Sequence, residues 1–185
     1  MLTTTKNRIQ LFPSEAGHMD FAPTTKLQNK LLDFLHQRYP HVSIERVLSG
    51  RGLENIYQFF DYTLNGNLPN AVSIDPHIAG KHVIEDGLNE SDQVAVRSLE
   101  LFIEIYGATI GNLCLCCLPF GGVYIAGGIA PRLLDMLQSP AFHSALMNKG
   151  RMQSILNLIN INVIINQNVG LLGAAAFSVK NLYNQ

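Results

Sequence analysis

The chain has 185 residues and a formal net charge of −1, and 47% of its residues are hydrophobic while 15% are charged. This composition is too apolar and too weakly charged for a disordered segment, and the length suits one domain with a buried core. No long basic run is present to neutralise a phosphate backbone, so nucleic acid is not an expected partner.

Neither a membrane segment nor a secretory signal is expected. Residues 1 to 10 are polar and lack the apolar core of a signal peptide. The long apolar stretches are interrupted by Gly, Asn or Pro before they reach the about 20 residues that a membrane crossing requires. The cysteines, Cys114, Cys116 and Cys117, are too crowded for the paired disulfide framework of small secreted domains. We therefore expect a cytoplasmic protein with no membrane partner.

The first predicted element is a β-hairpin at the N-terminus. Its strands are expected over residues 2 to 5 and 8 to 12, with a turn at residues 6 and 7. Ile9 and Leu11 alternate with polar residues in the second strand, which is the pattern of a strand with one apolar face.

A helix is predicted after the hairpin, where Thr25 and Gln28 have the spacing of a capping box. This helix should end near residues 39 and 40 and be followed by short helical pieces as far as Phe60. Residues 62 to 76 are rich in Asn, Gly, Pro and Ser, which predicts an exposed connection. The predicted apolar face of the helix consists of Leu27, Leu31, Phe34 and Leu35.

The clearest predicted helix runs from about Ser91 to Cys117, because apolar residues recur there at steps of three and four. Gly107 and Gly111 lie one turn apart in it, a spacing that permits a neighbouring backbone to approach closely. Its core-facing stripe is expected to comprise Leu99, Phe102, Ile103, Tyr106, Ile110, Leu113 and Cys117.

Strands and helices then alternate to the end of the chain. Strands are predicted over residues 123 to 126 and 161 to 165, with Pro131 in the first turn of an intervening helix. A terminal helix is expected over about residues 171 to 183. This alternation favours an α/β fold in which a layered sheet is flanked by helices.

Glu15 and His18 are the first candidate site residues, three apart around Gly17 and just after a predicted strand. A turn of this kind can aim both side chains at one ligand. A carboxylate offers only acceptors and a neutral imidazole offers one donor and one acceptor, a set suited to the hydroxyls of a sugar. The alternative interpretation is a pair of solvated loop residues.

Glu45 is a further candidate, at the start of a predicted helix, where an acidic residue is also favoured simply by the helix dipole. His41 precedes it by four residues and could meet it on a helix, but two ligands make a poor zinc site. The three cysteines point in different directions on a helix and are expected to be packing residues. No metal site is predicted.

Gly121, Gly122, Gly127 and Gly128 bracket the predicted strand over residues 123 to 126. Their spacing matches neither the dinucleotide-binding fingerprint nor a Walker A loop, so a Rossmann or P-loop assignment fails. These glycines form either tight turns or a loop that faces a nucleotide.

Four segments, residues 14 to 23, 41 to 50, 121 to 132 and 170 to 173, together resemble bacterial glucokinases in sequence and order. The resemblance spans nearly the whole chain. It implies the ribonuclease H-like, actin-like fold of sugar kinases, and ATP-dependent phosphoryl transfer, with Mg²⁺, to the 6-hydroxyl of glucose.

The same resemblance assigns roles to the candidate residues. Glu15, His18 and Glu45 would bind the hydroxyls of glucose or a similar hexose. The four glycines, Gly121, Gly122, Gly127 and Gly128, would lie on the nucleotide side of the cleft.

The chain departs from the family at its N-terminus. Family members carry an N-terminal domain with an Asp-x-Gly-Gly-Thr phosphate loop and the catalytic base, and this sequence contains neither. We therefore expect a C-terminal portion without a catalytic residue of its own, in which Met1 is internal to a longer protein. Its terminal helix should pack on the missing domain or on a second copy of the chain. The alternatives are a non-catalytic hexose-binding module or a gene remnant.

Overall fold

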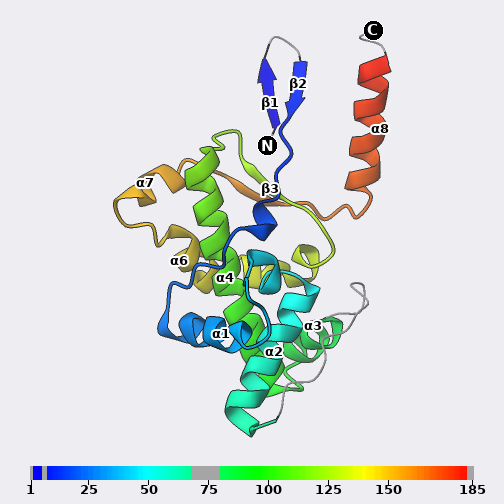
Figure 1. The fold of residues 1–185 in the computed structure, drawn as a ribbon. Helices are drawn as coiled ribbons and strands as arrows, with labels where there is room; N and C mark the ends of the chain where they lie inside the picture. The colour runs from blue at the N-terminus through cyan, green and yellow to red at the C-terminus, as the bar shows by residue number, and fades with distance from the viewer. Residues whose placement is uncertain (1, 6–7, 68–79, 183–185) are drawn as a thin grey trace.

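The structure, a computed structural model, describes residues 2–5, 8–67 and 80–182 (Figure 1). A mostly helical body surrounds the long helix α4 (Gln93–Cys117). Two arms project from the same end of this body, a β-hairpin and the terminal helix α8 (Val169–Leu182) (Figure 1).

The predicted hairpin is confirmed. Strand β1 (Leu2–Thr5) pairs antiparallel with β2 (Arg8–Leu11), and Leu2 lies opposite Leu11. The predicted turn at residues 6 and 7 lies outside the described residues.

Helix α1 (Lys26–His36) begins where the capping signal predicts it. The Thr25 hydroxyl accepts a hydrogen bond of 3.2 Å from the backbone N–H of Gln28. In a capping box the Gln28 side chain would accept from the N–H of Thr25, the N-cap. Here it accepts from the N–H of Thr24, one residue earlier, at 2.8 Å. Gln28 is consequently buried at 1% exposure.

Two details of the α1 prediction are wrong. Leu27 is 40% exposed, because the partner helix packs on the later turns, where the ring of Phe34 lies 5.6 Å from that of Phe59. The helix also ends at His36 instead of near residues 39 and 40. Pro40 disfavours helical backbone at Tyr39, so the chain leaves the helix in a turn.

The short helical pieces predicted up to Phe60 are instead one 3-10 turn, η2 (Ile44–Arg46), and one helix of 16 residues, α2 (Gly50–Asn65). The glycines at its start, Gly50 and Gly52, fall in the first turn after the N-cap, Ser49. Residues 62 to 65, predicted as an exposed connection, are the last turn of α2, and residues 68–79 lie outside the described residues.

Helix α4 confirms the clearest sequence prediction. Asp92 caps it by accepting a hydrogen bond of 2.7 Å from the N–H of Val94. Leu99, Phe102 and Ile103 are at most 1% exposed, whereas Cys117, predicted to face the core, is exposed in the last turn.

Among the described residues, α4 is the one helix long and apolar enough to cross a membrane by length and composition, which corrects the expectation that every apolar stretch falls short. Its apolar window is 56% buried inside the protein. α2, α3 (Lys81–Leu88) and α6 (Pro140–Met147) all pack against it, so α4 has the surroundings of a core helix.

Strands β3 (Val123–Ile125) and β4 (Ile161–Val163) form a parallel pair, with Tyr124 opposite Asn162. Pro131 lies in the first turn of a 3-10 helix, not of an α-helix. The chain between the strands forms η3 (Ala130–Leu133), α5 (Leu134–Leu137), α6, η4 (Gly150–Met152) and α7 (Gln153–Leu156).

The predicted layered sheet is therefore present only in part. Within the described ranges, the sheets are the parallel pair and the hairpin, each of two strands, and the structure is mostly helical. The terminal helix predicted over residues 171 to 183 is confirmed as α8, although residue 183 lies outside the described part.

Candidate functional site

Glu15 and His18 come from one turn. Glu15 precedes the 3-10 helix η1 (Ala16–His18), and its backbone carbonyl accepts a hydrogen bond of 2.9 Å from the N–H of His18. The Glu15 carboxylate does not cap the turn, and the side chains of Glu15 and His18 are exposed. Both side chains are thus available on the same surface loop.

Glu45 lies in η2, a turn whose neighbouring residues pack into the protein. Val47, which follows it, is fully buried at 0% exposure. The guanidinium of Arg46 lies 4.1 Å from the centre of the Tyr39 ring. Glu45 was expected at the start of a helix, and it lies in the first turn of the 3-10 helix η2, whereas α2 begins five residues later at Gly50.

The backbone joins the two turns directly. Ile44 N–H donates to the carbonyl of Met19 at 2.8 Å, and Phe21 N–H donates to the carbonyl of Val42 at 2.9 Å. Asp20 and Ser43 form an antiparallel bridge between these bonds. Two segments more than 20 residues apart in sequence are therefore held side by side.

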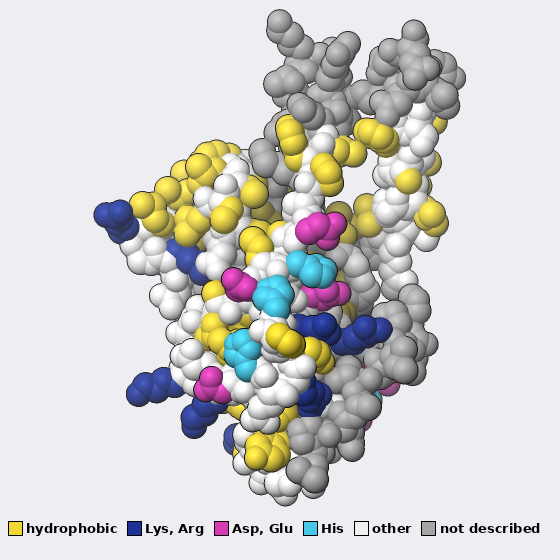
Figure 2. Space-filling model, viewed as in Figure 1, with side chains coloured by type: hydrophobic (Ala, Val, Ile, Leu, Met, Phe, Trp, Pro, Cys, Tyr) yellow, Lys and Arg dark blue, Asp and Glu magenta, His cyan; other side chains and the backbone are white. Residues whose placement is uncertain are grey.

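This bridge brings His18 and Glu45 together. His18 Nε2 lies 3.7 Å from Glu45 Oε2, with the two side chains 67% and 59% exposed. Acidic and histidine side chains gather on one face in the middle of the molecule (Figure 2). The arrangement presents carboxylate acceptors and an imidazole to solvent, which is the set that a polyhydroxylated ligand can use.

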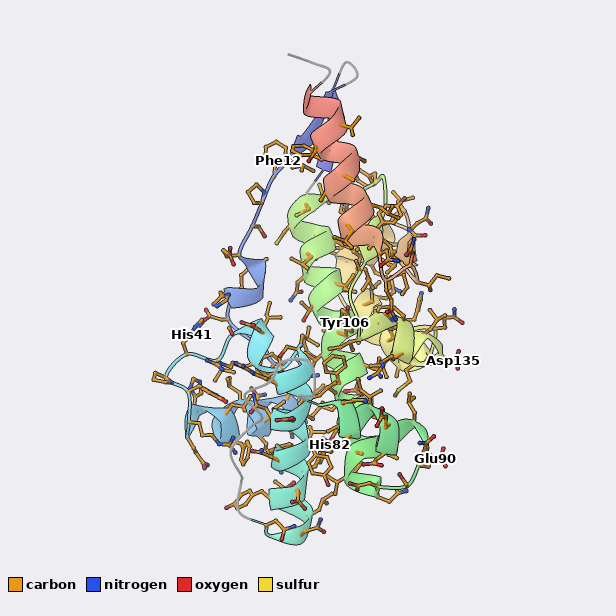
Figure 3. The ribbon with its side chains drawn as sticks, turned by 90° about the vertical axis from the view of Figure 1, so that its right-hand side faces the viewer. Phe12, His41, His82, Glu90, Tyr106 and Asp135 are labelled. Atoms are coloured by element: carbon orange, nitrogen blue, oxygen red, sulfur yellow. The ribbon has the colours of Figure 1, made fainter. Side chains whose placement is uncertain are left out.

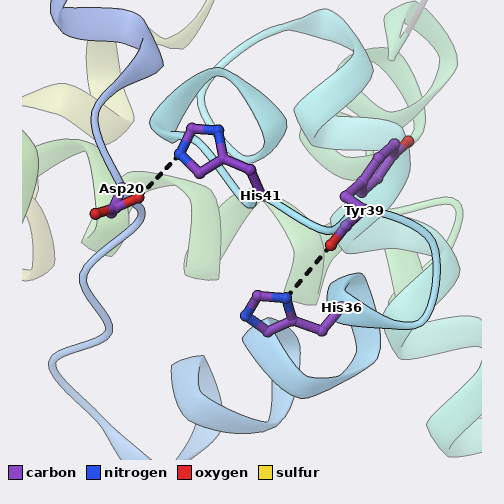
Figure 4. A network of polar contacts seen from close by, with 4 residues as sticks. All are labelled: Asp20, His36, Tyr39 and His41. Carbon is purple, nitrogen blue, oxygen red and sulfur yellow. Dashed lines mark hydrogen bonds and ion pairs between the residues drawn. The ribbon is translucent and has the colours of Figure 1, made fainter.

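His41 is placed differently from its prediction. His41 and Glu45 do not share a helix, because η2 begins only at Ile44, and His41 Nε2 contacts Asp20 Oδ1 at 2.9 Å instead (Figure 4). Asp20 was not singled out from the sequence. Its position two residues after His18 was the available signal, but its partner lies 21 residues away.

The surface around the site is open. A small cavity lies behind the bridge, between Phe21 and Ile44 on one side and Thr109 and Asn112 of α4 on the other. Its volume of about 20 Å³ accommodates one water molecule but no sugar. Glu15, His18 and Glu45 lie exposed outside this cavity.

The described residues contain no group of three or more His, Cys, Asp or Glu side chains able to hold a metal ion. Of the cysteines predicted to be packing residues, only Cys114 is buried, while Cys116 and Cys117 are exposed near the end of α4.

The four glycines lie at the two ends of β3. Gly122 and Gly127 have φ angles of +105° and +119°, which side chains rarely adopt, so both turns require glycine. A Cβ added at Gly121, Gly127 or Gly128 would meet nothing within 4 Å. This open backbone fits the close approach of a nucleotide, and it equally fits two tight turns. Asp135 follows the second glycine pair in sequence. Figure 3 shows Asp135 and His41 on opposite sides of α4.

A sequence model of the family described as Glucokinase matches residues 1–181. The chain belongs to the glucokinase family. The glucokinase of Nostoc sp. strain PCC 7120 is 42% identical over 188 residues, which covers 91% of this chain and 54% of the relative. The glucokinase of Yersinia enterocolitica serotype O:8 is 42% identical over 165 residues, covering 89% of this chain and 49% of the relative. This glucokinase-family chain spans about half the length of the curated relatives it matches.

Solved glucokinases have the same fold. The structure of a glucokinase from an Antarctic psychrotroph matches with a TM-score of 0.82 and 29% identity, covering 100% of this chain and 54% of that one. A glucokinase from Balamuthia mandrillaris in complex with glucose matches with a TM-score of 0.71 over 88% of this chain and 45% of that one. The second match, at 18% identity, shows the likeness of fold alone.

Proposed function

We propose that this chain is the glucose-binding part of a glucokinase and that Glu15, His18 and Glu45 bind the sugar hydroxyls. The observation that carries the proposal is the contact of 3.7 Å between His18 and Glu45, on a surface shared with the turn of Glu15, in a chain of the glucokinase family. Ionised acceptors discriminate among hydroxyl patterns because each one requires a correctly placed O–H donor.

The proposed reaction is ATP-dependent phosphorylation of glucose to glucose 6-phosphate. The 6-hydroxyl oxygen attacks the γ-phosphorus of ATP, its proton passes to a base outside this chain, and ADP leaves. Bound ATP with Mg²⁺ supplies the phosphoryl group. We assign Gly121, Gly122, Gly127 and Gly128 to the nucleotide side, which their open backbone supports.

The fold assignment extends this proposal. The parallel pair β3 and β4, with helices in the connection between them, supports a place among the ribonuclease H-like, actin-like sugar kinases. We treat residues 1 to 185 as one C-terminal domain. The other half of the complete enzyme would be a separate region. The free cysteines are consistent with the proposed cytoplasmic location.

Calorimetric titration of the chain with glucose tests the proposed contacts. We expect Glu15→Gln and Glu45→Gln each to weaken binding by about tenfold or more, because each removes an ionised acceptor. Glu90→Gln, which changes an exposed carboxylate away from η1 and η2, is the matched control. Unchanged affinity in both site variants would contradict the proposal.

A coupled assay for glucose 6-phosphate, with ATP and Mg²⁺, tests whether this chain needs the other half of a glucokinase for activity. We expect no turnover from this chain alone, and turnover when a polypeptide equivalent to the N-terminal half of a relative is added. Turnover at an ordinary kinase rate without that addition would show that the chain carries the whole reaction. A chain that binds hexose but gains nothing from the added polypeptide would be a binding module only.

A further inference from the structure

Two side chains of the α2 region hold the turn that carries Glu45. Asn55 is fully buried at 0% exposure, and its Nδ2 donates a hydrogen bond of 2.9 Å to the backbone carbonyl of Arg46. The Ser49 hydroxyl donates a hydrogen bond of 2.8 Å to the backbone carbonyl of Glu45. Two consecutive carbonyls of η2 are therefore tied to the start of α2.

We propose that Ser49 and Asn55 are positioning residues for hexose binding, because they fix the direction in which the Glu45 carboxylate leaves the surface. The inference rests on the proposed role of Glu45 as a hexose contact. Asn55 is enclosed by protein, so it acts on a ligand only through the turn that it holds.

The geometry assigns this task to the donor half of the Asn55 amide. A buried amide is costly unless its polar atoms are paired. The Oδ1 atom lies 3.5 Å from the Tyr39 hydroxyl, which is long for a hydrogen bond, whereas the bond from Nδ2 to Arg46 is short. The stronger contact of this buried side chain thus ends on the turn that carries Glu45.

Ser49 combines two contacts in one hydroxyl. Besides donating to Glu45, its oxygen accepts a hydrogen bond of 2.9 Å from the N–H of Gly52, which caps α2. The same atom therefore fixes where α2 begins and where the preceding turn lies. Separating these contacts by mutation is possible because one needs only an acceptor and the other needs a proton.

The exposed contact between His41 and Asp20 is weaker by comparison. It also joins the two turns, but its side chains are 56% and 89% exposed, and such surface pairs contribute little. The amide of Asn55 is the more effective restraint, because Asn55 itself is fully buried and its loss would leave the Arg46 carbonyl without this partner.

The first test is calorimetric glucose affinity of an isosteric pair of variants. Asn55→Asp keeps the shape and the oxygen facing Tyr39 but removes the donor to Arg46. We expect glucose affinity to fall by about tenfold, as for loss of one buried hydrogen bond. Tyr39→Phe removes only the long contact on the acceptor side and should leave affinity within about twofold of the wild type.

The second test uses Ser49 and does not depend on the folding of the Asn55 variant. Ser49→Thr retains the hydroxyl and should retain affinity. Ser49→Asp retains the cap of α2 but lacks the proton for the Glu45 carbonyl, so it should keep its melting temperature and lose affinity. Ser49→Ala should lose both. Affinity that follows the melting temperature across these variants would overturn the positioning role.

Tyr57→Phe is the matched control on the same helix. It removes a hydrogen bond of 2.7 Å to Asp92, on a side chain two residues from Asn55, and should not change glucose affinity. Asn55→Asp and Ser49→Ala with unchanged affinity, alongside a weakened Glu45→Gln, would overturn the inference and leave the proposed function standing. Unchanged affinity in Glu45→Gln itself would remove the proposed function.

A measurement without sugar covers the case of undetectable binding. Backbone amide NMR shifts of Glu45 and Arg46 should move in Asn55→Asp and Ser49→Ala and stay in place in Tyr57→Phe. Unmoved shifts in the first two variants would overturn the proposed restraint on the turn, whatever the chain binds.

Discussion

At the scale of single residues, the contact between Tyr57 and Asp92 joins α2 to the cap of α4. The Tyr57 hydroxyl donates to Asp92 Oδ2 at 2.7 Å, while Asp92 Oδ1 accepts from the N–H of Val94. Burial and the bond to Asp92 raise the pKa of Tyr57 to about 12. The folded protein therefore favours the neutral phenol, because an ionised one would face the carboxylate of Asp92.

The contribution of this contact to stability should depend on pH in the alkaline range. Stability from a raised pKa is present below the unfolded value of about 10 and is lost as pH rises through about 12. We expect Tyr57→Phe to be less stable than the wild type at neutral pH by about 1 kcal/mol. The difference should shrink between about pH 10 and 12 in denaturant titrations. A difference that stays constant across that range would contradict the assignment.

Asp20→Asn should have a small effect, because Asp20 and His41 are both exposed. We expect a loss of glucose affinity below about threefold and a change in unfolding free energy below about 1 kcal/mol. Calorimetry and denaturant titration measure the two quantities. A loss as large as that of Glu45→Gln would mean that Asp20 contacts the sugar directly.

The sequence predicts candidate residues best where a local motif contains them. Glu15 and His18 share one turn, and their spacing is visible without coordinates. Asn55 was not predicted, because its role comes from a backbone carbonyl nine residues earlier and from complete burial. In the sequence, a buried asparagine that holds a turn looks the same as an asparagine on an exposed helix face.

At the scale of elements, α4 and α6 approach each other closely at two glycines. A Cβ at Gly107 would lie 2.4 Å from the carbonyl oxygen of Phe142, and one at Gly111 would lie 2.5 Å from that of Leu146. Both obstacles are backbone atoms, which cannot rotate away. The predicted glycine spacing on α4 thus serves the packing of α6.

Gly107→Ala should destabilise the protein even though alanine is the better helix former. The gain in helix propensity is about 1 kcal/mol, and overpacking costs about 1 to 3 kcal/mol together with a shift of α6. Gly173→Ala in α8 is the control, since its Cβ would meet nothing within 4 Å and should not destabilise. Thermal unfolding compares the two variants, and a stabilised Gly107→Ala would contradict the close packing.

The element predictions succeed where apolar periodicity continues over many residues. The 25 residues of α4 contain the apolar periodicity that predicts a helix, and the N-cap residue Asp92 directly precedes them. α2, in contrast, was predicted only as short helical pieces, and it is one helix that begins at Gly50. Gly52 is needed there, since a Cβ would lie 2.4 Å from the backbone of Val47. This contact depends on the fold and is not visible in the sequence.

At the scale of the whole molecule, α8 is an apolar helix without a matching surface in the described structure. Its residues through Val179 are exposed or half-buried, including Leu171 at 75% and Leu172 at 57%. The helix stands apart from the body beside the hairpin (Figure 1). We propose that the other half of a full-length glucokinase covers it, and that isolated chains associate through it instead.

Light scattering tests this association. We expect the chain to form dimers or larger species as concentration rises, and the double variant Leu171→Gln/Leu172→Gln to remain monomeric. Leu158→Gln changes a leucine that is 66% exposed outside α8 and should leave association unchanged. A wild-type chain that stays monomeric at high concentration would contradict the proposal.

We propose above that one surface, made by η1 and η2, binds the hexose. A titration of the ¹⁵N-labelled chain with glucose, followed by amide NMR shifts, measures this most directly. We expect the amides of Gly17, His18 and Glu45 to move together with one binding constant, while those of Ser144 in α6 and Asn148 at its C-cap stay in place. Shifts that centre elsewhere and leave these three amides in place would contradict it.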